Sequence, residues 1–275
     1  MNENTKVMIA VAPNGARKTP QDHPALPITA AELATTASRC LEAGACMIHL
    51  HVRDRLLRHT LDPAHYKEAI AAIEDAVGDK LIVQITTEAV GLYRPEEQMQ
   101  IVREVKPAAV SLALRELCPT EQEEIQAAEF FQWLDRERVA PQYILYDRDD
   151  IARFENFKQR GLIPGEHHTI LLVLGRYSTD QQSDPEQLAP LLNAIETANT
   201  WWLCAFGATE SACMARAISE GGHCRVGFEN NLLLPDGSTA ADNAALVGLV
   251  AESACAAGKE LATAEQARKI MGYRE

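Results

Sequence analysis

The chain has 275 residues, of which 47% are hydrophobic and only 5% are aromatic, and its formal net charge at pH 7 is −13. A chain of this size buries about 75% of its unfolded surface, so one large core is feasible. The acidic balance argues against non-specific binding to nucleic acid or to anionic membrane surfaces, and we expect neither as a partner.

Cellular location and covalent framework can also be judged from the sequence. No apolar run approaches the ~20 residues of a membrane span, and the first six residues lack the charged and apolar regions of a signal peptide. The seven cysteines are an odd number without any Cys-x-x-Cys spacing, which indicates neither a disulfide framework nor a thiolate zinc site. We therefore predict a cytoplasmic protein.

Apolar runs and helical segments alternate along the whole chain. Continuous apolar runs are typical of parallel strands buried on both faces, and Thr29 with Glu32 forms a capping-box pattern that opens a helix. We expect strands over 7–12, 46–52, 81–87, 108–114, 142–146, 169–174, 200–205 and 224–229. We expect helices over 30–43, 63–77, from Pro95 onward, 121–136, 150–160, 185–198, 210–219 and 241–257.

Eight strand–helix units in this length predict a TIM (β/α)8 barrel. An open doubly wound sheet is the alternative, but no Gly-x-Gly-x-x-Gly follows the first strand. Without a linker or low-complexity segment, we expect one domain over 1–275. The polar, Pro-rich loop over 13–26 is long for its position, and we expect it to fold over the site.

His49 and His51 lie two residues apart in an apolar strand. Side chains two apart on a strand share a face, and imidazole suits zinc, whose catalytic sites have three protein ligands and one open position. The alternative is one partly exposed and one structural core histidine. Arg53 and Asp54, directly after the strand, favour a functional strand end.

A third ligand should come from the carboxyl end of another strand, where TIM-barrel active sites lie. Glu229, which we place at the end of the eighth strand, is the preferred candidate, because only the first strand separates the eighth from the second. Glu88 is the rival. His167, His168 and His223 precede their strands, which puts them at the opposite end of the barrel, where a structural role is expected.

Several motifs together resemble the β-keto acid cleavage enzymes. They are A-P-N-G-A at 12–16, P-A-L-P-I-T at 24–29, E-A-G-A at 42–45, H-L-H-V-R-D at 49–54, R-V-G-F-E-N-N at 225–231 and A-T-A-E-Q-A-R at 262–268. The resemblance implies a zinc-dependent TIM barrel that assembles as a homo-oligomer, with a tetramer expected. It implies the conversion of a β-keto acid and acetyl-CoA into acetoacetate and a new acyl-CoA, with zinc on His49, His51 and Glu229.

Other residues receive roles from the same resemblance. Arg225 and Asn230 stand at catalytic positions, and Arg225 could hold a carboxylate through a bidentate fork. Thr86 and Ser111 match hydroxyls that bind the substrate, with ordinary strand-end polar residues as the alternative. Asn14 and Arg17 are also expected at the substrate. A cation at position 17, followed by Lys18, would favour an anionic far end of the substrate, unless this loop is merely solvated.

The chain departs from the family pattern at two places around the expected site. The residue after the glutamate ligand is usually Asp but is Asn230 here, and an amide cannot take up a proton near neutral pH. The fifth strand of the family usually reads Pro-Glu-x-Glu, whereas this chain has P-Q-Y-I at 141–144. Deprotonation would then fall to metal-bound water, whose pKa can drop to about 7, or to Glu88 or Asp54.

Three functions follow as hypotheses. The leading one is zinc-dependent β-keto acid cleavage with acetyl-CoA. The second is a zinc-dependent carbon–carbon lyase or hydrolase with different chemistry, which would not consume CoA. The third is a non-catalytic metabolite-binding barrel that binds substrate without turnover.

Overall fold

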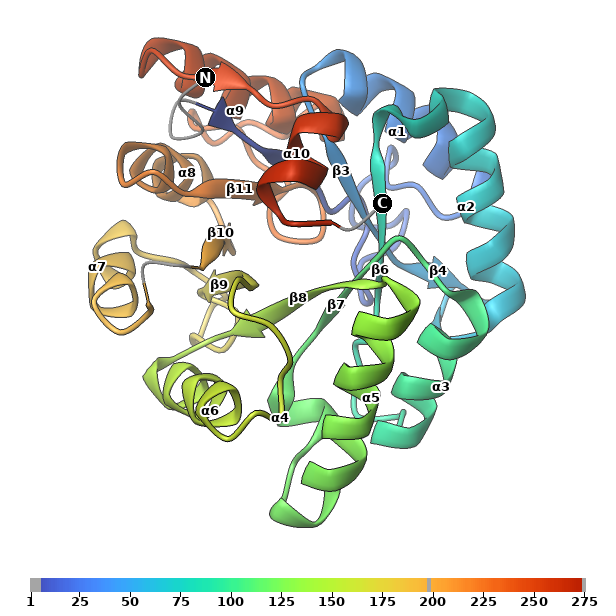
Figure 1. Ribbon diagram of the computed structural model, residues 1–275. Coiled ribbons are helices and arrows are strands. Elements are labelled where there is room, and N and C mark those ends of the chain that lie inside the picture. Colours follow the sequence, from blue (N-terminus) through green and yellow to red (C-terminus); the bar gives the residue numbers. More distant parts are fainter. Residues whose placement is uncertain (1–5, 197–198, 274–275) are drawn as a thin grey trace.

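Eight parallel strands close into a barrel in a computed structural model that describes residues 6–196 and 199–273 (Figure 1). Each barrel strand pairs with the next one along the chain, and the last pairs with the first. The strands are β2 (Ile9–Val11), β3 (Met47–Leu50), β6 (Ile82–Thr86), β7 (Ala109–Leu112), β8 (Ala140–Leu145), β9 (Thr169–Leu174), β10 (Thr200–Ala205) and β11 (His223–Val226). The predicted TIM barrel is confirmed.

Helices surround the barrel (Figure 1). Their bounds are α1 (Ala30–Glu42), α2 (Pro63–Val77), α3 (Pro95–Val105), α4 (Leu114–Leu117), α5 (Glu124–Glu137), α6 (Arg148–Gln159), α7 (Leu188–Leu192), α8 (Glu210–Ser219), α9 (Asn243–Ala256) and α10 (Ala264–Ile270). The capping box predicted at Thr29 and Glu32 is present, with Thr29 as the N-cap of α1. The helices predicted over 63–77 and 210–219 have those same bounds.

Several predicted elements differ from the structure. The strand over 7–12 is split into β1 (Lys6–Val7), which belongs to a separate small sheet, and the barrel strand β2. The helix expected over 185–198 is a short 3-10 turn, Pro185–Gln187, followed by α7. Residues 197–198 of the expected helix lie outside the described part of the chain. A helix that began at Pro185 would need the N–H of residue 190 as a donor, and Pro190 has none, so the α-helix begins only at Leu188. The strand over 46–52 ends at Leu50 and is followed by a hairpin of β4 (Val52–Arg53) with β5 (His59–Thr60). The strand over 108–114 gives way to α4, and that over 224–229 ends at Val226.

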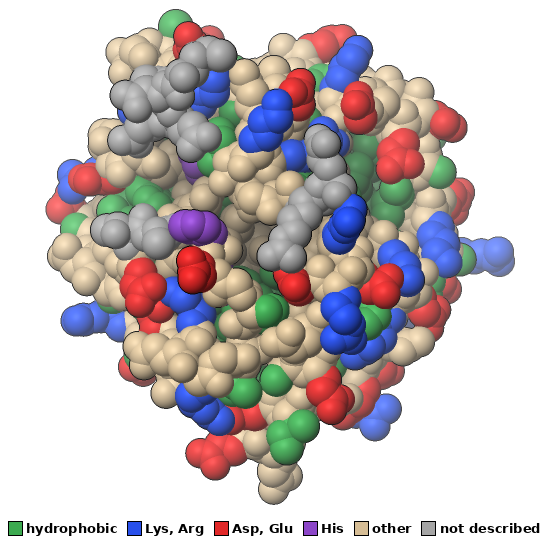
Figure 2. Space-filling model, viewed as in Figure 1, with side chains coloured by type: hydrophobic (Ala, Val, Ile, Leu, Met, Phe, Trp, Pro, Cys, Tyr) green, Lys and Arg blue, Asp and Glu red, His purple; other side chains and the backbone are tan. Residues whose placement is uncertain are grey.

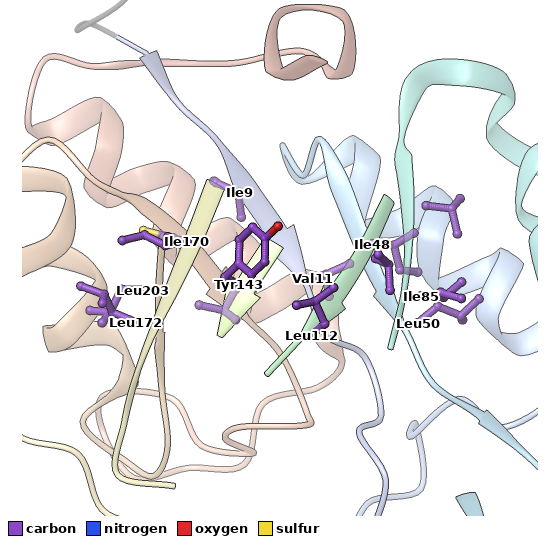
Figure 3. Packing of buried hydrophobic residues seen from close by; sticks show 14 of the residues in the cluster. Ile9, Val11, Ile48, Leu50, Ile85, Leu112, Tyr143, Ile170, Leu172 and Leu203 are labelled. Atoms are coloured by element: carbon purple, nitrogen blue, oxygen red, sulfur yellow. The ribbon is translucent and has the colours of Figure 1, made fainter. Parts of the chain in front are cut away.

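Alternation along the barrel strands separates two layers of buried side chains. One layer faces the helices and is apolar, and Figure 3 shows ten labelled members of it, among them Ile9, Ile48, Leu112 and Leu172. The alternate residues face the barrel interior. There, β9 and β10 contribute apolar side chains such as Leu171 and Trp202, which belong to a separate cluster.

A small separate sheet lies at the amino ends of the strands. It joins β1 (Lys6–Val7) to β12 (Glu260–Leu261), which precedes α10.

On the face drawn in Figure 2, acidic and basic side chains are interspersed rather than gathered by sign. Within 6–196 and 199–273, no helix has the length and apolar character needed to cross a lipid bilayer.

Candidate metal centre and substrate cavity

Two imidazoles and one carboxylate converge at the carboxyl end of the barrel. His49 lies in β3 and His51 directly follows it, and their Nε2 atoms are 3.1 Å apart. Glu229 Oε2 is 3.7 Å from His49 Nε2 and 3.5 Å from His51 Nε2. One ligand atom from each of the three residues lies within 4.8 Å of the others. The side chains that the sequence proposed as a metal triad therefore face a common point.

The position of Glu229 depends on two glycines. We expected Glu229 to end the eighth strand, but it lies in a turn three residues beyond the end of that strand. Gly227 begins that turn with a φ of +134°, and a Cβ there would meet Ala12 O at 2.5 Å. Gly15 has a φ of +60°, and its added Cβ would lie 2.5 Å from Glu229 Cγ. Larger residues would push this carboxylate away from the histidines.

Two glutamines fix the orientation of His49. Because Gln84 Oε1 can only accept, the contact of 2.8 Å means that His49 Nδ1 carries the proton and leaves Nε2 free to bind a metal. Gln84 Nε2 in turn donates to Gln142 Oε1 at 3.2 Å. Burial, reinforced by Arg225, holds the pKa of His49 well below its usual range, so its imidazole is neutral.

The charge state of Glu229 also suits a cation. Burial alone would raise its pKa, but the Arg225 guanidinium, with Nη2 3.6 Å from Oε1, and the His51 imidazole hold it well below its usual range. Its Oε2 and His51 Nδ1 are buried without a hydrogen-bond partner. Two imidazoles and a carboxylate are a known zinc ligand set. These residues therefore fit a divalent metal ion.

A cavity opens beside this cluster. Its lining residues are His49, His51, Thr86, Thr87, Glu88, Ser111, Leu112, Ala113, Glu116, Ile144, Tyr146, Val173, Arg176, Phe206, Arg225 and Glu229. Among the polar groups, Ser111 Oγ and two nitrogens of Arg225 are buried and unpartnered. Buried polar atoms of this kind usually have a partner, so the cavity offers hydrogen-bond donors to a ligand.

The loop over 13–26 contacts the backbone of His51 and Glu229, but Arg17 does not line the cavity. Its side chain is 55% exposed, and Nη1 is 2.7 Å from Glu88 Oε1 at the cavity mouth. Arg176, which the sequence reasoning missed, lines the cavity and reaches the same oxygen at 2.9 Å. Lys18 donates to the backbone oxygen of Glu229 at 2.7 Å.

Two further residues expected at the substrate or reaction centre lie behind the cavity wall. Asn14 is fully buried, and its Nδ2 donates to Pro27 O at 3.0 Å and His51 O at 3.1 Å. Asn14 thus anchors the loop and the chain at His51. Asn230 is buried, does not line the cavity and faces Glu210. By contrast, Thr86 and Ser111 do line it.

Sequence reasoning missed several residues of this region. Arg176 follows the sixth strand directly after Gly175, and that position at the carboxyl end of a barrel strand was the available signal. Glu116 and Glu210 lie on helices, in α4 and α8, where an acidic residue gives no signal of burial. Burial raises the pKa of Glu116. Asp54, considered as a base, caps the β4–β5 hairpin through Arg58 and does not line the cavity.

A larger hollow, of about 800 Å³, lies at the opposite end of the barrel. It is lined by the residues that precede β3, β6 and β7 together with the segment from Leu261 to Tyr273. In the described ranges, the three-residue cluster that could hold a metal ion lies at the carboxyl end and not here. The smaller cavity is therefore the candidate functional site.

Fold and site together define a TIM barrel with a candidate metal centre at the carboxyl ends of its strands. The profile of the beta-keto acid cleavage enzyme (BKACE) family matches residues 6–273, and the chain belongs to this family.

Characterised relatives span nearly the whole chain. It is 31% identical to the 3-keto-5-aminohexanoate cleavage enzyme of Acetoanaerobium sticklandii, covering 97% of this chain and 98% of the relative. It is 30% identical to the 3-oxoadipate:acetyl-CoA acetyltransferase of Cupriavidus necator, covering 96% and 94%. The apo structure of ObcA is similar in fold, with a TM-score of 0.74 and 18% identity, covering 90% of this chain and 66% of ObcA.

Proposed function

We propose that the protein cleaves a β-keto acid with acetyl-CoA, giving acetoacetate and a new acyl-CoA, and that its resident metal is zinc. The observation that carries this proposal is the convergence of His49, His51 and Glu229 beside the unpartnered nitrogens of Arg225. Family membership and the names of two relatives, one of which transfers to acetyl-CoA, support the same reaction.

The metal would be held by His49, His51 and Glu229. When bound, it supplies a Lewis acid that polarises the keto oxygen. Arg225 provides a fork of N–H donors for the substrate carboxylate. Ser111 and Thr86 are neighbours across β6 and β7 and line the cavity, and they would hydrogen-bond the substrate.

A carboxylate on the cavity wall can take the proton that must leave the carbon between the two carbonyl groups. Of the two candidates from the sequence, Glu88 lines the cavity and Asp54 does not. Burial alone would raise the pKa of Glu88, but the nearby His51 and Arg17 lower it, so Glu88 is ionised and able to accept a proton. We assign this transfer to Glu88.

The substrate's far end would meet a mixed wall. Ile144, Val173 and Phe206 are apolar, whereas Arg176 and Glu88 form an ion pair. Because Glu88 already neutralises much of the charge of Arg176, a short apolar far end suits this wall. Arg17 and Asn14 would act indirectly, by holding Glu88 and the chain at His51.

The proposal extends to the state of the whole protein. We propose one domain, a homo-oligomer with a tetramer as the expected state, and a cytoplasmic location. The described cysteines are all unpaired, in keeping with a reducing compartment.

The test is a panel of β-keto acids with alkyl, carboxylate or amino far ends, incubated with acetyl-CoA and metal-loaded protein. We expect acetoacetate and the matching acyl-CoA in equal amounts, detected by mass spectrometry, and their loss in Glu229→Gln but not in Glu220→Gln, an exposed control. Cleavage without CoA transfer would indicate a lyase or hydrolase instead. Binding without turnover would indicate a metabolite-binding barrel.

A further inference from the structure

A buried carboxyl group lies behind the cavity, outside the metal triad. Glu210 is the first residue of α8, and only 2% of it is exposed. Asn230 Nδ2 lies 3.3 Å from Glu210 Oε1, and Asn231 Nδ2 lies 3.3 Å from Oε2. Burying a carboxyl group is costly unless it is hydrogen-bonded. Both oxygens of Glu210 meet that condition by accepting from neighbouring side-chain amides.

Asn230 connects this carboxyl group to the cavity. Its Nδ2 also donates to the backbone oxygen of Arg225 at 3.2 Å, and its Oδ1 lies 3.3 Å from Cys204 Sγ. Arg225 Nη2 is 3.5 Å from the same sulfur. A continuous series of contacts therefore runs from Glu210 through Asn230 and Cys204 to the guanidinium that lines the cavity.

The direction of these bonds follows from the backbone of Arg225. Its carbonyl oxygen can only accept, so the NH2 end of Asn230 must face it and Glu210, and the carbonyl end of Asn230 must face the Cys204 thiol. Burial raises the pKa of Glu210 to about 8, and the two amide donors oppose that rise. Reversing the Asn230 amide would set its oxygen against the backbone oxygen of Arg225, and its NH2 group against the thiol donor of Cys204.

We propose that Glu210 is a positioning residue, which acts with Asn230 as a carboxyl–amide pair that holds Arg225 toward the substrate carboxylate. This rests on the proposed function, because the role of Arg225 comes from it. Glu210→Gln together with Asn230→Asp again sets a donor against an acceptor between positions 210 and 230, but an aspartate at 230 cannot donate to the backbone oxygen of Arg225, so we expect partial recovery. Each substitution alone creates a mismatch. Asn230→Asp opposes two carboxyl groups, and Glu210→Gln turns an NH2 group toward one of the two amides.

The experiment compares wild type, both single variants and the double variant. The measurements are kcat/KM for cleavage, affinity for acetoacetate by calorimetry, metal content and thermal midpoint. Acetoacetate needs no turnover and carries the carboxylate that Arg225 would bind. We expect each single variant to lose roughly 10- to 100-fold in kcat/KM and in acetoacetate affinity, as substitution of outer-shell partners does. Metal content should stay unchanged, and Glu220→Gln should match wild type.

The double variant decides the matter. Recovery of about 10-fold or more over either single variant supports a coupled pair. Losses that simply multiply, or single variants that change only the thermal midpoint, would overturn the positioning role while leaving the proposed function intact. A wild type that binds acetoacetate without cleaving, with affinity still coupled between the two positions, supports the role and removes the proposed reaction. A wild type that neither cleaves nor binds would overturn both.

Discussion

The barrel strands carry two layers of side chains, one apolar and one polar, and several buried polar atoms of the second layer have no hydrogen-bond partner. The layer toward the helices is apolar and closed, with residues such as Ile48, Ile85 and Leu112 at 0% exposure (Figure 3). The interior layer of the same strands holds polar groups, and several of their atoms lack partners, including Ser111 Oγ, Gln142 Nε2 and Arg225 Nη1. Neighbouring residues in one strand thus serve opposite purposes.

The difference shows where the protein gives up stability for binding. Apolar burial in the outer layer contributes roughly 25 cal/mol per Å², whereas an unpartnered buried polar group costs about 1–3 kcal/mol. Natural proteins tolerate such groups where a ligand will satisfy them. Substitutions in the outer layer should therefore change stability, and those in the interior layer should change binding and turnover.

The sharpest test uses adjacent residues of β3 that face opposite layers. His49→Ala should abolish stoichiometric metal binding and lower activity by more than ~100-fold, because loss of a ligand exceeds the cost of losing an outer-shell partner. Ile48→Val should cost only about 0.5–1.5 kcal/mol of unfolding free energy, with metal content and activity unchanged. Metal analysis and denaturant titration of both variants make the comparison. Equal metal content in the two variants would contradict the assigned triad.

A second test keeps charge and changes geometry in the interior layer. Arg225→Lys retains a cation beside Glu229 but loses the planar fork, which lysine cannot reproduce. We expect kcat/KM to fall roughly 10- to 100-fold, since a hydrogen bond to a charged group contributes about 1.5–3 kcal/mol. Metal content should hold. Steady-state kinetics and metal analysis of this variant test the prediction. Full activity in the lysine variant would show that Arg225 does not bind the substrate carboxylate through its fork.

A third pair, in β7, tests whether unpartnered polar atoms serve a ligand. Ser111→Ala removes an unsatisfied hydroxyl, so the free energy of unfolding should stay constant or rise, while kcat/KM falls about 10-fold. Leu112→Ala, on the other layer, should destabilise by about 2–5 kcal/mol with little change in kcat/KM. Unfolding curves and kinetics measured on the same preparations separate the two effects. A large loss of stability in the serine variant would mean that its hydroxyl has a structural partner.

The smallest effect is expected outside both layers. Arg17 is half-exposed, and an exposed ion pair contributes only about 0–1 kcal/mol. Arg17→Gln should therefore change the ratio of kcat/KM for anionic and cationic keto acids by less than ~5-fold. Arg176→Gln, within the cavity wall, should change that ratio more. If Arg17 has the larger effect, the loop closes further in the complex than in the free protein.

Much of the architecture could be predicted from the sequence, because each strand repeats the same local pattern. Buried strands such as 169–174 are uninterrupted apolar runs in the sequence. The side chains of Thr29 and Glu32 accept hydrogen bonds from each other's backbone N–H groups at the start of α1. The family followed from motifs spread along the chain, among them those at 49–54 and 225–231, and the candidate metal triad followed from two histidines on one face with a glutamate expected at a nearby strand end. These features depend on contacts that are local or fixed by barrel topology.

Only the tertiary structure decided which polar residues face the cavity. A turn at Gly227 directs Glu229 inward and Asn230 outward, although they are adjacent in sequence. Arg176 and Glu116 enter the cavity wall from a loop and a helix, while the more conspicuous Arg17 remains half in solvent. Strand periodicity determines a side chain's direction only while the strand continues. Beyond its last residue, backbone turns and long-range hydrogen bonds set that direction, and one sequence does not encode them locally.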